Sequence, residues 1–112
     1  MSDLTVAEVL ERAADILNSK GAWAQGRYAV ADTGKGCASL DERAVRWCAI
    51  GAMGKASGEG VGGEFSTQAR EFANMVAFGG SIANFNDAPE RTQEEVVAKL
   101  REAAALAREQ GK

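Results

Sequence analysis

Three copies of one helix-start signal constrain this chain more than any other feature. A Ser or Thr followed three positions later by Glu occurs at Thr5 and Glu8, at Ser39 and Glu42, and at Thr92 and Glu95. In this capping box the hydroxyl accepts from the backbone of the first turn, and the carboxylate accepts from the backbone N–H of the capping residue. The spacing therefore predicts three helices, which begin at these positions.

Apolar residues recur at helical spacing after the first and last of these signals. The first helix has the stripe Val6, Val9, Leu10, Ala13, Ile16 and Leu17, and the last has Val96, Leu100, Ala103, Ala104 and Ala107. A further helix is expected to begin at Ser66 or Thr67 and to end at Gly79 and Gly80, with a connection over residues 81–89 before the last helix. The predicted fold class is mainly α: a compact bundle of about four helices in a single domain over residues 1–112.

The second predicted helix contains two glycines where a helix would favour alanine. We expect residues 46–54 to be a buried part of this helix, which ends between residues 55 and 57. Each glycine inside a helix costs about 1 kcal/mol relative to alanine. Gly51 and Gly54 therefore indicate that a neighbouring backbone, an aromatic ring or a ligand lies against this helix.

The segment between the first two predicted helices, residues 21–38, is rich in glycine yet contains Trp23 and Tyr28. Such a long connection is usually functional or packed back on the core. We expect a long ordered loop or a small β-hairpin, with a short strand within residues 27–32.

Charge and composition exclude several classes of function. A net charge of −3 disfavours duplex nucleic acid as a partner. No apolar run reaches the roughly 18–20 residues that span a bilayer, and residues 1–4 do not resemble a secretion signal, so we expect a cytoplasmic protein without a membrane partner. The spacing of Cys37 and Cys48 favours reduced thiols.

The chain has no histidine, which removes Ser-His-Asp and Cys-His catalysis and the histidine zinc sites. Gly34-Lys35 and Gly54-Lys55 lack the remaining residues of a phosphate-binding loop. Cys48 lies in an apolar stripe and is interpreted as a buried thiol of high pKa. We predict no catalytic residue, no metal site and no cofactor.

A polar stretch precedes the last helix and has two interpretations. Asn86, Asp87 and Pro89 can simply form a turn and a helix start. The exposed N–H groups at this helix start, together with Arg91, could instead bind a phosphate or carboxylate. Asn86 and Asp87 could then form hydrogen bonds with a ribose or with the edge of a base. Trp23 and Trp47 likewise suit core packing first and ligand stacking second.

Several phrases of the sequence together resemble a family of small uncharacterised proteins from bacteria and their phages. They are GAWAQG at 21–26, Ala31-Asp32 with Gly34, WCAIGA at 47–52, and FNDAP at 85–89 with Arg91-Thr92 and Glu95-Val96. The resemblance covers residues 5–107 and provides no activity. It implies that the loop with Trp23, Gln25 and Asp32 meets the Trp47-Cys48 helix and the Asn86-Asp87 turn in space.

We therefore expect a noncatalytic protein that binds a small polar, nucleotide-like molecule in a pocket or at an interface between identical subunits. The candidate ligand-binding residues are Trp23, Gln25, Tyr28, Asp32, Trp47, Cys48, Asn86, Asp87 and Arg91. A phage setting would fit the sequestration of a host signalling molecule. The alternative is a module that binds or inhibits a host protein, and the third hypothesis is an enzyme that uses Cys48 or Asp87.

Overall fold

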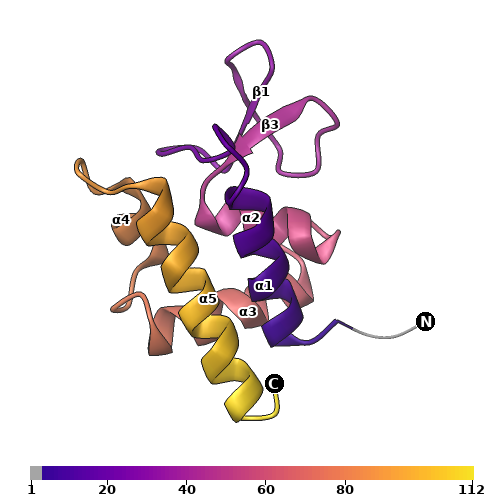
Figure 1. Ribbon diagram of the computed structural model, residues 1–112. Helices are drawn as coiled ribbons and strands as arrows, with labels where there is room; N and C mark the ends of the chain where they lie inside the picture. Colours follow the sequence, from indigo (N-terminus) through magenta and orange to yellow (C-terminus); the bar gives the residue numbers. More distant parts are fainter. Residues whose placement is uncertain (1–3) are drawn as a thin grey trace.

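The computed structural model describes residues 4–112 and combines five helices with a three-stranded antiparallel sheet (Figure 1). The elements in chain order are α1 (Val6–Leu17), β1 (Ala29–Ala31), β2 (Gly36–Cys37), β3 (Ala44–Trp47), α2 (Ala49–Ser57), α3 (Glu64–Val76), α4 (Ile82–Asp87) and α5 (Gln93–Glu109). The sheet, in the order β2-β1-β3, lies at one end of the helical body. The fold is thus mostly helical, as expected, but it is not a simple four-helix bundle.

Helices α1 and α5 begin at the predicted capping boxes. The backbone N–H of Thr5 donates to Glu8 Oε1 over 2.9 Å, and that of Thr92 donates to Glu95 Oε1 over 2.9 Å. The predicted apolar stripes of the two helices pack against each other and supply much of the core, in which Leu10 and Leu100 are fully buried.

The predicted start of the second helix is wrong. Residues 44–47 form strand β3, and the helix begins at Ala49 with Cys48 as its N-cap. Strand β3 pairs with β1, and Trp47 lies opposite Ala29. The capping box at Ser39 favours a helix locally, but Val45 and Trp47 also suit a sheet, and pairing with a distant strand decides the outcome. The small hairpin expected within residues 21–38 is confirmed as β1 and β2.

The start of α3 and the connection after it differ from the sequence prediction. Helix α3 begins at Glu64 after the N-cap Gly63, and it ends at Val76 before Gly79 and Gly80. The expected connection over residues 81–89 contains the short helix α4, which Ser81 caps by accepting from the Asn84 N–H over 3.1 Å. Ile82 anchors α4 in the core, which stabilises a helix too short to form alone.

The close approach predicted from Gly51 and Gly54 is confirmed, and protein backbone makes the approach. A Cβ atom on Gly51 would lie 1.8 Å from the carbonyl oxygen of Tyr28, and one on Gly54 would lie 2.7 Å from the backbone nitrogen of Val61. The missing side chains therefore let α2 pack against the start of β1 and against its own outgoing loop.

Within residues 4–112, every helix is too short or too polar to cross a bilayer.

Candidate functional site

Asn86 joins three segments that are far apart in the sequence. Its side chain is buried in the last turn of α4, and its Oδ1 accepts from Trp23 Nε1 over 2.8 Å and from the Ala49 N–H over 3.0 Å. Its Nδ2 donates to the Ala24 carbonyl over 3.0 Å and to Asp87 Oδ1 over 2.8 Å. The segments that the family resemblance placed together therefore meet at one buried amide.

Two neighbouring residues hold the loop before β1 against the end of α4. Gln25 Nε2 donates to the carbonyls of Asn86 and Ala88 over 3.0 and 2.9 Å. The Gly26 N–H donates to Asp87 Oδ1 over 3.0 Å. These bonds satisfy backbone groups of two irregular segments and hold the segments against each other.

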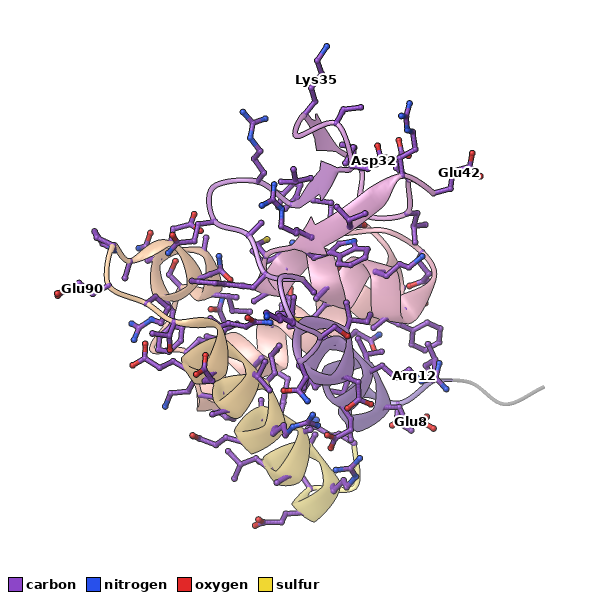
Figure 2. The ribbon with its side chains drawn as sticks, turned by 45° about the horizontal axis from the view of Figure 1, so that its top comes forward. Glu8, Arg12, Asp32, Lys35, Glu42 and Glu90 are labelled. Carbon is purple, nitrogen blue, oxygen red and sulfur yellow. The ribbon has the colours of Figure 1, made fainter. Side chains whose placement is uncertain are left out.

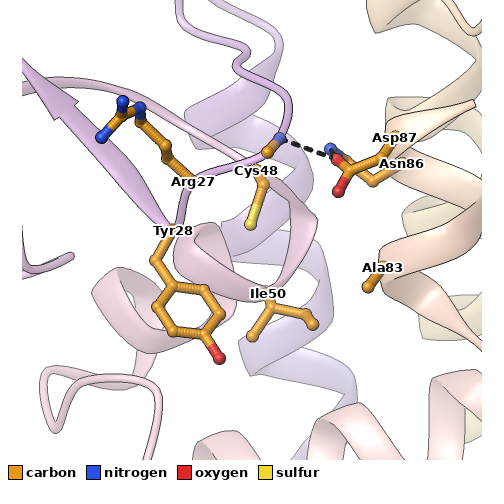
Figure 3. A pocket seen from close by; sticks show the side chains of 8 residues that line it. Arg27, Tyr28, Cys48, Ile50, Ala83, Asn86 and Asp87 are labelled. Carbon is orange, nitrogen blue, oxygen red and sulfur yellow. Dashed lines mark hydrogen bonds between the residues drawn. The ribbon is translucent and has the colours of Figure 1, made fainter. Parts of the chain in front are cut away.

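A pocket of about 310 Å³ opens beside this network. Figure 3 shows Tyr28, Cys48 and Ile50 on one side and Ala83, Asn86 and Asp87 on the other. Gly26 and Arg27 complete the lining. The volume lies near the lower end of the roughly 300–1,000 Å³ typical of small-molecule sites, and the lining combines apolar walls with a few polar groups, as such sites do.

Cys48 faces this pocket as the N-cap of α2, and not from inside a helix as its sequence context suggested. Its Sγ accepts from the Gly51 N–H over 3.3 Å. Burial raises the pKa of the thiol, and the nearby Asp87 carboxylate raises it as well. Together these two effects outweigh the Gly51 and Ile50 N–H groups, which lower the pKa. The thiol is therefore neutral at pH 7, which makes it a poor nucleophile.

We expect native Cys48 to react slowly with iodoacetamide at pH 7.5, at least about tenfold more slowly than an exposed thiol, because it is both buried and protonated. A Cys37→Ser variant isolates the Cys48 signal, and mass spectrometry over time measures it. Denaturant should make labelling complete. Rapid labelling of the folded protein, with a labelling rate that is half-maximal below pH 8, would instead support a catalytic role for the Cys48 thiol.

Other predicted site residues lie elsewhere. Exposed Asp32 pairs with Arg43 over 3.2 Å at the sheet. Arg91 stacks over Phe85, with its guanidinium carbon 3.5 Å from the ring centre, and its Nε donates to the Phe85 carbonyl over 2.8 Å. Both side chains have structural partners, and neither lines the pocket beside Asn86.

The two tryptophans do not line this pocket and pack against the core beside it. Trp47 Nε1 donates to the Ser39 carbonyl over 3.0 Å, and the backbones of Trp23 and Trp47 are joined by an isolated β-bridge. Both rings pack against the core. This is the packing role favoured from the sequence, and it leaves Tyr28 as the aromatic residue of the pocket.

Sequence reasoning missed Gly26, Arg27, Ile50 and Ala83 in the lining. Ala83 lies four positions before Asp87, so both residues share one face of α4. That relation would have identified Ala83 if α4 had been predicted. Among residues 4–112, no three His, Cys, Asp or Glu side chains gather as a metal-binding group.

Fold and site together define a small, mostly helical protein whose sheet-and-loop end forms a pocket with α2 and α4. Residues 1–106 match the model of DUF6197, a family of unknown function, and the chain belongs to this family. The family resemblance found in the sequence is thereby confirmed. No curated protein and no solved structure matches the chain.

Proposed function

We propose that this protein is a noncatalytic binding protein that holds a small, planar, nucleotide-like molecule in the pocket between Tyr28 and Asp87. The observation that carries the proposal is the position of one carboxylate opposite an aromatic ring across a cavity of about 310 Å³. The ring supplies stacking area and the carboxylate accepts hydrogen bonds from N–H groups.

The chemistry of the lining favours a heterocycle with N–H donors, such as a nucleobase. Asp87 is exposed at the pocket, and its Oδ1 is oriented by Gly26 and Asn86. Ile50 and Ala83 offer apolar contact, and the neutral Cys48 thiol adds no charge. Hydrogen bonds to a carboxylate are stronger than those between neutral groups, so Asp87 would set the orientation of the ligand.

The rigid wall behind Asp87 supports binding without a large conformational change. Asn86 is 1% exposed and uses both ends of its amide. A carboxylate that is held in place beforehand loses little entropy when a ligand binds. We propose that the protein acts by holding its ligand in the cytoplasm, as a sequestering protein does.

Titration with nucleosides, followed by two-dimensional NMR of backbone amides, tests this proposal. We expect shifts centred on Gly26, Tyr28 and Ala83, and an Asp87→Asn variant that binds about tenfold to a hundredfold more weakly because a charged acceptor is lost. Asp32→Asn is the matched control, since Asp32 is exposed but lies outside the pocket.

Two outcomes would contradict the proposal. One is that no nucleoside shifts these amides at millimolar concentration. The other is that Asp87→Asn and Asp32→Asn bind nucleosides as tightly as the wild type does.

A second candidate function is docking to a host protein. Met75 is 76% exposed and lines a hollow with half-buried Val6, buried Phe72 and three polar residues, Gln68, Glu71 and Lys112. Methionine is a frequent residue at protein-binding surfaces because its side chain adapts to different partners. Partner capture that is lost in Met75→Lys but kept in Asp87→Asn would favour this alternative over the pocket.

A further inference from the structure

One face of the sheet brings two arginines together. Val30 in β1 lies opposite Arg46 of β3 and opposite Gly36 of β2. Residues that are directly opposite in neighbouring strands point to the same face. Arg46, Val30 and the bare backbone of Gly36 therefore form one row across the sheet.

The side chain of Arg27 occupies the space above Gly36. A Cβ atom on Gly36 would lie 2.5 Å from Arg27 Nη1 and 3.3 Å from Arg27 Cδ. Gly36 does not have a positive φ, so its backbone conformation does not require glycine. The missing side chain instead leaves room for the arginine, and Figure 3 shows the Arg27 guanidinium directed away from the Tyr28–Asp87 pocket.

Arg27 and Arg46 line a shared hollow of about 400 Å³, together with Trp23, Gln25 and Val30. Within residues 4–112 neither arginine forms a salt bridge, whereas Arg43, just before β3, is paired with Asp32. Figure 2 shows a third cation, Lys35, pointing outward from the turn between β1 and β2. Two guanidinium groups without an acidic partner among the described residues therefore line one hollow of a chain whose net charge is −3.

We propose that Arg27 and Arg46 form a subsite for a phosphate group. Guanidinium groups bind phosphate through paired N–H···O bonds, and an anion between two arginines would offset their mutual repulsion. Arg27 also lines the Tyr28–Asp87 pocket, so the two hollows share this residue. Resting on the proposed function, this connection assigns the ligand to the phosphorylated class: a nucleotide whose base lies near Asp87 and whose phosphate lies between the arginines.

Pyrophosphate tests the subsite without using the other pocket. In NMR titrations at low salt we expect shifts of the Val30, Gly36 and Arg46 amides, and about tenfold weaker binding in Arg27→Gln and in Arg46→Gln. Arg43→Gln is the control, because its guanidinium is already paired with Asp32. Absence of these shifts, or equal weakening in all three variants, would overturn the subsite.

Comparing a nucleoside with its monophosphate separates this inference from the proposed function. Asp87→Asn should weaken the binding of both, whereas Arg46→Gln should weaken only that of the monophosphate, by about tenfold. If pyrophosphate binds but no nucleoside or nucleotide does, the subsite stands and the proposed function fails. If the nucleoside binds as tightly as its monophosphate, the phosphate subsite fails and the proposed function stands.

Discussion

Replacing Gly51 by Ala is expected to destabilise the protein by about 3 kcal/mol or more. The new Cβ would lie 1.8 Å from the carbonyl oxygen of Tyr28, an impossible contact for two non-bonded atoms. Main-chain atoms cannot escape by changing rotamer, so α2 and the start of β1 must separate, as in an overpacked core. The same carbonyl accepts from the Cys48 N–H over 3.2 Å, so this hydrogen bond should weaken as well.

Urea unfolding of purified Gly51→Ala measures this loss. Gly62→Ala is the matched control, because a Cβ on Gly62 meets nothing within 4 Å and the residue does not have a positive φ. The control should be neutral or slightly stabilising, since alanine reduces the entropy of the unfolded chain. If Gly51→Ala unfolded at the wild-type urea concentration, the close packing of α2 against Tyr28 would be wrong.

Asn86→Ala is expected to cost about 3–5 kcal/mol, because it deprives one buried and two half-buried polar groups of their partner at once. Trp23 Nε1 and the Ala49 N–H lose an acceptor, and the Ala24 carbonyl loses a donor. Each unsatisfied buried group costs about 1–3 kcal/mol, although water entering the gap reduces the total.

Equilibrium unfolding combined with tryptophan fluorescence tests the role of Asn86. The folded variant should emit at longer wavelength than the wild type, since the hydrogen bond that positions the half-buried Trp23 is gone. Asn84→Ala is the control on the same helix, because the Asn84 side chain is exposed. Equal stabilities of the two variants would refute a central structural role for Asn86.

The parts of the fold that were predictable from the sequence depend on local signals. The Thr5 and Thr92 capping boxes each precede a long apolar stripe, so local preference and core packing agree. Gly51 revealed a close backbone contact because glycine in a helix is otherwise unfavourable. The meeting of Trp23 with Asn86 came from the family resemblance, since nothing in the spacing of these residues indicates it.

The parts that were missed depend on distant contacts. Residues 44–47 follow a helix-start signal, and only their pairing with β1 makes them a strand. Cys48, which the sequence placed inside a helix, is therefore the N-cap of α2, and its thiol lies at the pocket. Helix α4 has six residues, too few to show a period, and without it the face shared by Ala83 and Asp87 could not be predicted.

Native mass spectrometry of protein purified gently from its producing cells tests most directly whether the Tyr28–Asp87 pocket is a ligand site. The protein is mixed with nucleosides and nucleotides if it is isolated empty. We predict that the wild type and Asp32→Asn carry one small molecule with the mass of a nucleoside or nucleotide, and that folded Asp87→Asn loses it. A wild type that stays empty in the presence of these compounds, or an Asp87→Asn protein that keeps the same bound mass, would contradict the proposed site.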